Sequence, residues 1–196
     1  MRTRLFAAIV ATAVAALLNT GVSTAAETAD RAVPGAHAFA GQAKAAQLTN
    51  SQAAALRSKV DAYLKETGGK QIALNEIDLN GRGRVLVTLP GEDRPRDFTS
   101  NSGTLVAADP CITGAWYNGY FCAYKGVDYT GDRIDMYYCQ SYSIPWISQG
   151  SWINNQTYGT KARFYNGSGS LIYTTPGAWS GNNSYSWVGV YSVRPC

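Results

Sequence analysis

Histidine is almost absent from this sequence, which holds a single copy, His37, among its 196 residues. A serine or cysteine hydrolase needs a histidine beside its nucleophile, and the zinc-peptidase motif H-E-x-x-H needs two. Glutamate is missing after residue 110, so the last part of the chain offers only Asp128, Asp132 and Asp135 for the paired carboxyl groups of a glycosidase. We therefore expect a binding protein and not an enzyme, with no catalytic residue, no cofactor and no metal centre.

Net charge and long apolar runs are also scarce. The formal net charge is +4, whereas a nucleic-acid binder normally carries a dense basic face, so no nucleic acid is expected as a partner. The apolar run from Leu5 to Leu18 is shorter than the roughly 20 residues that cross a bilayer as a helix. It follows Arg2 and Arg4 and precedes small residues, which is the pattern of a secretion signal. Residues 1–26 are thus predicted to be a signal peptide, and the mature protein is expected to be secreted, extracellular and without a membrane span.

The four cysteines all lie in the last part of the chain, at Cys111, Cys122, Cys139 and Cys196. An even number of cysteines in an exported chain points to disulfides, because a zinc site would pair them at closer spacing or with histidines. Four cysteines allow three pairings, and spacing does not choose among them. We favour Cys111–Cys122 and Cys139–Cys196, because the first bridge could staple a hairpin and the second would fix the chain end.

The segment after the signal peptide begins with a spacer and a helix. Residues 27–47 are rich in alanine and have no sustained apolar period, which predicts a flexible spacer. Thr49 and Gln52 then fit a capping box at a helix start, and Gly68-Gly69 ends the helix. One face of this predicted helix carries its apolar residues, Leu56, Val60, Tyr63 and Leu64.

A hairpin and a linker are expected next. The runs 71–79 and 84–89 are strand-like, and Asn80-Gly81 between them is a turn signal. Helix and hairpin together form a small α+β unit over residues 48–90, which either docks on the C-terminal part or is a pro-segment that is removed. Residues 91–110 are rich in polar and breaker residues, which predicts a linker.

The region from residue 111 to residue 196 has a different composition. It holds all five Trp and twelve of the thirteen Tyr. Runs that favour strands, such as 161–165 and 187–193, recur between turn signals, and no helical period is sustained. The region is therefore predicted to be a compact, mainly β domain that two disulfides staple.

One spacing in this region matches a known fold signature. Tyr124, Tyr129 and Gly131 have the spacing of the Greek-key signature of βγ-crystallin domains. There the first aromatic residue packs over a folded hairpin, and the glycine takes a positive φ that a side chain would disfavour. A similar spacing, one residue longer, follows at Tyr173, Trp179 and Gly181.

A family resemblance rests on the first of these two spacings, Tyr124, Tyr129 and Gly131, together with Cys111, Gly114 and Phe121-Cys122. The segments Asn154-Asn155 and Asn182-Asn183 add to it. Residues 111–196 resemble the secreted actinomycete proteins of the Streptomyces-type metalloproteinase inhibitor family. The resemblance implies a βγ-crystallin-like Greek-key sandwich with two disulfides. It also implies a secreted metallopeptidase as partner, which a rigid loop would inhibit by occupying the cleft as a substrate does.

The reactive residues of the family do not transfer position by position. The family braces its reactive loop with a short second disulfide loop, whereas Cys139 and Cys196 are far apart in this sequence. We take the segment just after Cys139 as the candidate inhibitory loop, because a proline there favours an extended backbone. Its residues are Ile144, Pro145, Trp146 and Ile147. The alternative for this segment is a buried edge strand or a crossing loop.

Two other binding functions stay open. Asn154-Asn155 and Asn182-Asn183 partly match the calcium motif of crystallins, but the hydroxyl positions of that motif are incomplete, so a role in turns is expected. Four tryptophans could include exposed platforms that stack on sugar rings. They are Trp116, Trp146, Trp152 and Trp179. The protein would then be a carbohydrate or cell-surface binding module with a cell-wall glycan as its partner.

Overall fold

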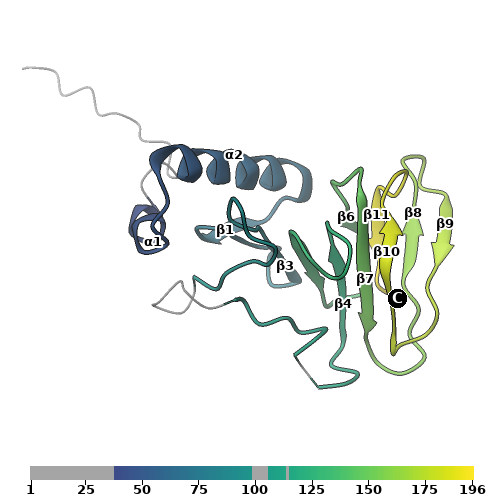
Figure 1. Ribbon diagram of the computed structural model, residues 1–196. Coiled ribbons are helices and arrows are strands. Elements are labelled where there is room, and N and C mark those ends of the chain that lie inside the picture. Colours follow the sequence, from purple (N-terminus) through teal and green to yellow (C-terminus); the bar gives the residue numbers. More distant parts are fainter. Residues whose placement is uncertain (1–37, 99–105, 114) are drawn as a thin grey trace, which may run out of the picture. The chain divides into compact units, whose positions relative to one another are not determined.

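Two antiparallel β-sheets and two helices make up the part of the chain that the computed structural model describes, residues 38–98, 106–113 and 115–196 (Figure 1). The predicted signal peptide, most of the expected spacer and Gly114 lie outside these ranges. The helices are α1 (Ala40–Ala45) and α2 (Asn50–Thr67). The strands are β1 (Lys70–Ala73), β2 (Glu76–Asp78), β3 (Gly83–Leu86), β4 (Tyr120–Tyr124), β5 (Arg133–Met136), β6 (Tyr142–Ser143), β7 (Gln149–Asn155), β8 (Arg163–Tyr165), β9 (Leu171–Thr174), β10 (Ser180–Ser186) and β11 (Ser192–Arg194). The predicted mainly β fold with two disulfides is confirmed.

Helix α1 occupies part of the segment that was expected to be a flexible spacer, so that expectation is wrong for residues 40–45. The side chain of Gln42 ties this helix to the rest of the fold. Its oxygen accepts a hydrogen bond from the backbone N–H of Leu74 at 2.6 Å, and its amide donates to the carbonyl oxygen of Phe98 at 3.2 Å. Tertiary contacts of this kind stabilise a short helix that the sequence pattern alone does not predict.

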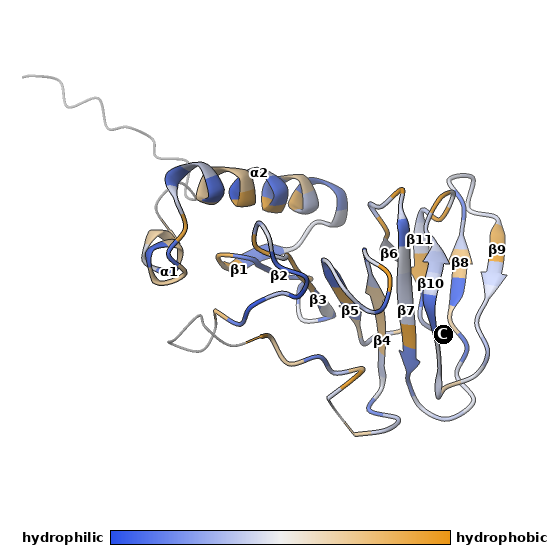
Figure 2. Ribbon diagram, viewed as in Figure 1, coloured by the Kyte–Doolittle hydropathy of each residue, from blue (hydrophilic) through white to orange (hydrophobic). Residues whose placement is uncertain are grey.

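Helix α2 begins and ends where its capping residues predict. The Thr49 hydroxyl accepts a hydrogen bond from the Gln52 backbone N–H at 3.2 Å, and the Gln52 side chain accepts one from the Thr49 N–H at 2.9 Å. Gly68, with φ of +68°, ends the helix and donates its N–H to the Leu64 carbonyl oxygen. Hydrophilic and hydrophobic residues alternate along α2 (Figure 2). Three of the predicted face residues are buried, Leu56, Val60 and Tyr63.

The run 71–79, predicted as one strand, is two strands, because the chain reverses between β1 and β2. Asn75 stabilises the reversal. Its buried side-chain amide N–H groups donate to the backbone carbonyl oxygens of Val87 and Arg96, at 2.9 and 3.0 Å, and the Asn75 backbone carbonyl oxygen accepts from the Val87 N–H at 2.8 Å. The predicted turn at Asn80-Gly81 joins β2 to β3, and both of its residues have positive φ, 60° and 72°.

The larger sheet has seven strands in the order β1-β2-β3-β5-β4-β7-β10, and the smaller has four in the order β6-β11-β8-β9. Because β3 pairs with β5, with Val85 opposite Ile134, the helix-hairpin unit is continuous with the sheet of the C-terminal region. The C-terminal region has two halves of four strands each, β4 to β7 and β8 to β11. The third strand of each half lies in the sheet that holds the other strands of the other half. β6 pairs with β11, and β10 pairs with β7.

An aromatic core lies between the two sheets. Phe164 on β8, from the smaller sheet, meets Phe121 on β4 and Trp152 on β7 with ring centroids 5.8 and 6.3 Å apart, both edge to face. Trp187 packs on Phe164 at 5.5 Å. These four side chains are fully buried. Their rings fill the interior of the β fold, as the aromatic composition of the region predicts.

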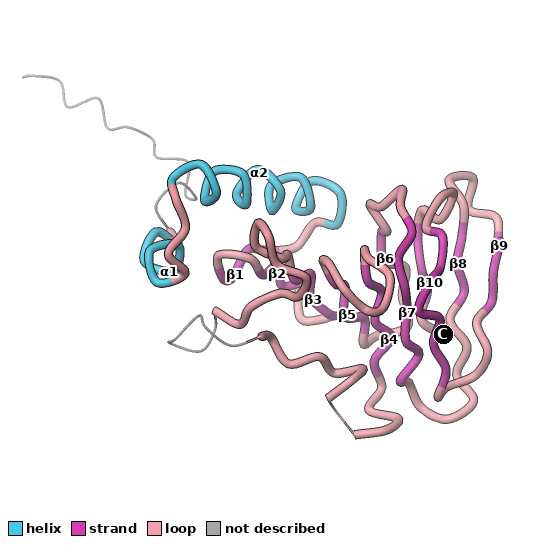
Figure 3. The backbone as a smooth tube through the Cα atoms, viewed as in Figure 1, coloured by secondary structure: helices cyan, strands magenta, loops and turns pink. Residues whose placement is uncertain are grey.

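The predicted linker, residues 91–110, is loop where the structure describes it (Figure 3). It packs into the fold, because Phe98, Ala107 and Asp109 are all buried. Arg96 and Val106 also form an isolated antiparallel bridge. Within the described ranges, neither helix has the length and hydropathy that a bilayer crossing requires.

Candidate functional site

The two disulfides join the favoured pairs. Cys111–Cys122 has its Cα atoms 6.2 Å apart and closes the irregular segment that precedes β4. Cys139–Cys196 has its Cα atoms 5.3 Å apart and ties the chain end to the loop before β6. Each bridge therefore restrains a loop at the edge of the β fold.

The signature residues lie together on the hairpin between β4 and β5. The Tyr124 and Tyr129 rings meet edge to face at 5.5 Å, and Gly131 has φ of +80°, as their spacing predicts. The Tyr124 hydroxyl donates to the carboxylate of Asp109 at 2.9 Å. Burial, and then the charge of Asp109, raise the pKa of Tyr124 above its ordinary value. This hydroxyl remains a hydrogen-bond donor that fixes the hairpin to the segment before Cys111.

The predicted echo of this signature is wrong. The corresponding hairpin of the second half joins β8 to β9 through residues 166–170, where Gly169 has φ of +78°. Tyr173 lies on β9, Trp179 immediately precedes β10, and Gly181 lies on β10 without a positive φ. The spacing of residue types at Tyr173, Trp179 and Gly181 therefore does not mark a second hairpin of this kind.

The candidate inhibitory loop joins β6 to β7, and only part of it faces solvent. Ile144 and Trp146 are buried, with exposed fractions of 5% and 3%, and Pro145 is half-buried. Ile147 is 85% exposed. The expectation that the whole run faces a partner is thus corrected, since two of its side chains belong to the core. Ile147 is the apolar side chain that this loop presents.

Hydrogen bonds and ring packing hold the loop on both sides of Ile147. Before it, the Ile144 N–H donates to the Tyr191 carbonyl oxygen at 2.9 Å. After it, the Ser148 carbonyl oxygen accepts from the Trp187 N–H at 2.9 Å. The Trp146 ring packs edge to face on Trp187 with centroids 5.9 Å apart. The backbone around Ile147 is therefore fixed to the residue before β11 and to the turn after β10.

Helix α2 supplies a further anchor through a buried polar network. The Trp146 indole N–H donates to the Tyr63 hydroxyl at 2.7 Å, and that hydroxyl donates to the carboxylate of Asp132. Asp132 also accepts from Lys59 Nζ at 2.7 Å, from the Thr88 N–H at 2.9 Å and from the Thr88 hydroxyl at 2.8 Å. Because each of these buried polar groups has a partner, the network fixes the underside of the loop.

The contacts of Asp132 and Tyr63 determine which of these two groups is ionised. Burial alone would raise the pKa of Asp132, but the charge of Lys59 and the hydrogen bonds from Lys59, Tyr63 and Thr88 outweigh it and hold that pKa below its ordinary value. Burial, and then the charge of Asp132, raise the pKa of Tyr63. At neutral pH Asp132 is ionised and Tyr63 is a protonated donor. Sequence reasoning missed this network because its members share no spacing motif.

The four candidate platform tryptophans divide into two classes. Trp146 and Trp152 are buried in the core, which removes them as surfaces for a sugar ring. Trp116 and Trp179 are exposed, by 72% and 41%, and their rings stack in parallel.

One of the paired asparagines stabilises a loop, because the Asn155 side-chain oxygen accepts from the Tyr117 N–H at 2.6 Å. Asn182 lies within β10, where its side-chain oxygen accepts from the Ser184 N–H at 2.9 Å beside an irregularity in the pairing with β7. Among the described residues, one cluster of metal-ligand types occurs, Asp109, Cys111 and Cys122. Its sulfur atoms are joined in a disulfide, so they offer no thiolate to a metal.

No family model, curated protein or solved structure matches this chain. The resemblance to the inhibitor family therefore rests on the motif residues named above.

Proposed function

We propose that the protein is a secreted metallopeptidase inhibitor whose reactive segment is the loop between β6 and β7, with Ile147 as the side chain that enters the peptidase. The observation that carries this proposal is the contrast within the loop. Ile147 is 85% exposed, while Ile144 and Trp146 on the same loop are buried. An isolated apolar side chain on a loop fixed at both ends suits a specificity pocket.

The backbone of the loop supports the same proposal. Among the described residues, no hydrogen bond engages the backbone N–H groups of Trp146 and Ile147. An exposed backbone N–H without a partner, such as that of Ile147, can donate to a backbone carbonyl oxygen in a peptidase cleft. Because its anchors already hold the loop, little conformational entropy is lost when it binds.

The fold around the loop supports the family resemblance. We assign the C-terminal region to the βγ-crystallin-type Greek key, with the hairpin of Tyr124, Tyr129 and Gly131 as its signature. The exchange of β6 and β10 between the two halves favours this assignment, because each half then covers the apolar face of the other. The inhibitory loop directly follows the exchanged strand β6.

Titration of a thermolysin-type metallopeptidase with the purified protein tests the proposal, and stoichiometric loss of peptide hydrolysis is the expected result. Ile147→Ala removes three carbon atoms at about 0.8 kcal/mol each, which weakens inhibition by roughly 50-fold. Ile147→Asp should abolish it, since a carboxylate would be buried in an apolar pocket. Leu171→Ala is the matched control, because Leu171 is exposed by 52% on β9 and lies outside the loop.

If the Ile147→Asp variant still inhibits the peptidase, this loop is not the inhibitory segment. If the peptidase keeps its full rate of hydrolysis in the presence of excess parent protein at micromolar concentration, the proposed inhibitory function is wrong.

A further inference from the structure

The geometry points to a second binding site, a surface that binds an uncharged polysaccharide by stacking its sugar rings on exposed aromatic side chains. We define this aromatic surface by four residues from three segments, Trp116, Tyr117, Tyr158 and Trp179. It lies apart from the inhibitory loop, and the proposed inhibition does not depend on it.

The four rings form two pairs that remain open to solvent. Trp116 and Trp179 are parallel, with an angle of 4° between their planes and centroids 5.9 Å apart. Tyr117 and Tyr158 meet edge to face at 5.8 Å. All four are at least 41% exposed, and Tyr158 reaches 80%. A cluster of four exposed aromatic rings favours a recognition surface, because contiguous exposed apolar patches, unlike single exposed side chains, mark binding sites.

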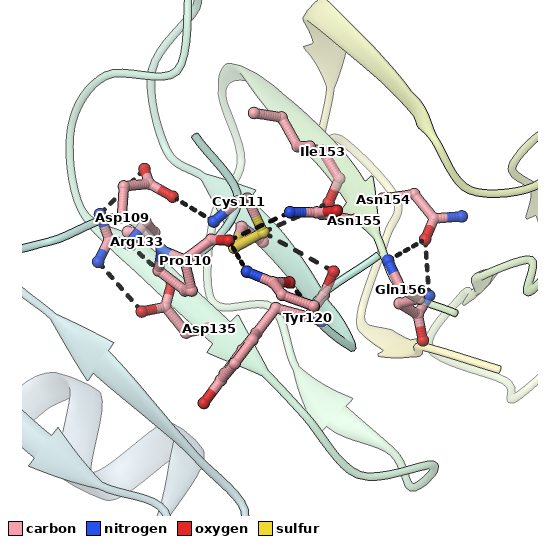
Figure 4. Close-up of a disulfide and its surroundings, with 12 residues drawn as sticks. Asp109, Pro110, Cys111, Tyr120, Arg133, Asp135, Ile153, Asn154, Asn155 and Gln156 are labelled. Atoms are coloured by element: carbon pink, nitrogen blue, oxygen red, sulfur yellow. Dashed lines mark hydrogen bonds and ion pairs between the residues drawn. A yellow bond between two sulfur atoms is a disulfide. The ribbon is translucent and has the colours of Figure 1, made fainter. Parts of the chain in front are cut away.

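A buried asparagine, Asn155, holds the segment that carries Trp116 and Tyr117, and Figure 4 shows Asn155 beside Pro110 and Cys111. The Asn155 side-chain amide donates to the carbonyl oxygens of Pro110 and Ala115, at 3.2 and 3.1 Å, and its oxygen accepts from the Tyr117 N–H. Asn155 is fully buried, and the Cys111–Cys122 bridge closes the same segment. The rings are therefore fixed before a ligand arrives, so less entropy is lost on binding.

The charge distribution selects the class of ligand. The sequence has no Asp, Glu, Lys or Arg in residues 110–124, 149–160 or 164–193, which include all four rings. A sulfated or uronic-acid polymer, or a nucleic acid, would meet no cation on these segments. A neutral pyranose needs none, because its C–H face packs on an aromatic ring and its hydroxyl groups bond to polar neighbours such as Thr157 and Ser180. The surface thus favours a neutral, β-linked polysaccharide, whose sugars present flat C–H faces.

The two sites lie at opposite ends of one strand. Ile147 stands two residues before β7 begins, while Asn155 is its last residue and Tyr158 follows three residues later. A strand of seven residues spans about 20 Å. A peptidase and a polysaccharide can therefore bind together, and each site can be disabled without the other.

Co-sedimentation of the full chain with insoluble chitin and with cellulose, and with heparin-agarose as the anionic arm, tests the inference. We expect binding to at least one neutral polymer and none to heparin. Trp116→Ala and Trp179→Ala should each weaken that binding by about tenfold or more. Tyr191→Ala is the control and should change nothing, because Tyr191 is exposed by 64% outside the aromatic surface.

A urea unfolding curve on each variant shows whether the fold is kept, and Ile147→Asp should bind the polymer as the parent does. The inference is overturned if neither neutral polymer is bound at micromolar protein, if heparin alone is bound, or if folded Trp116→Ala and Trp179→Ala bind as tightly as the parent. Loss of polymer binding with peptidase inhibition intact in the tryptophan variants would support two independent sites.

Discussion

Replacing Tyr63 by Phe removes one hydroxyl group from the network beneath the inhibitory loop. That hydroxyl donates to the buried carboxylate of Asp132 and accepts from the Trp146 indole N–H at 2.7 Å. The ring of the new side chain still fills the space of the old one. The variant therefore isolates the two hydrogen bonds from the packing of α2.

The expected loss of stability follows from the partners that remain. A hydrogen bond to a charged group contributes about 1.5–3 kcal/mol, and a buried donor without a partner costs about 1–3 kcal/mol. Because Asp132 keeps its bonds from Lys59 and Thr88, we take the lower part of both ranges and expect a loss of about 3 kcal/mol. For a folded unit of this size, such a loss lowers the melting temperature by roughly 6–12 °C.

Urea unfolding followed by tryptophan fluorescence measures this loss. Tyr158→Phe is the matched control, because Tyr158 is 80% exposed, and its free energy of unfolding should change by less than about 0.5 kcal/mol. If Tyr63→Phe unfolds within about 0.5 kcal/mol of the parent, the network does not hold the loop, and the rigidity argued for Ile147 loses its main support.

Two further predictions concern acid and truncation. The folded-state pKa of Asp132 lies below its unfolded value near 3.9, so its contribution to stability is present above about pH 4 and is lost as the pH falls through the folded-state pKa. The gap in unfolding free energy between the parent and Asp132→Asn should therefore shrink from pH 6 to pH 3 in urea titrations, and a constant gap would contradict the assignment. A chain of residues 106–196 lacks β3, so β5 becomes an unpaired edge and Asp135 loses the bond from Arg84 Nε at 2.9 Å. This shorter chain should aggregate, or unfold at a lower urea concentration than a chain of residues 38–196. Equal stability of the two chains would instead favour a removable pro-segment at residues 48–90.

Local signals predicted the parts of the fold that local chemistry decides. The capping box at Thr49 and the glycine at residue 68 fixed the ends of α2, because both act within one turn of the helix. The positive φ of Gly131 followed from its spacing after Tyr124. Each of these features depends on neighbours a few residues away, which a sequence displays directly.

Features that depend on distant partners were not predictable. The reversal between β1 and β2 depends on Asn75 bonding to Val87 and Arg96, and no turn dipeptide marks it. Trp146 is buried, and its indole N–H donates to the hydroxyl of Tyr63, a residue 83 positions earlier in the chain. The proline beside Trp146 indicated a loop correctly, but which of the loop's side chains faces solvent depends on this contact.

Hydrogen exchange on the complex with a thermolysin-type peptidase tests the central claim most directly. In the free protein, the N–H group of Ile147 should exchange quickly, since Ile147 is 85% exposed and no described residue accepts a hydrogen bond from its N–H. When the peptidase binds, this amide should become protected, while those of Trp116 and Tyr117 keep their exchange rates. Unchanged exchange at Ile147 in a complex that forms would place the contact elsewhere and contradict the account.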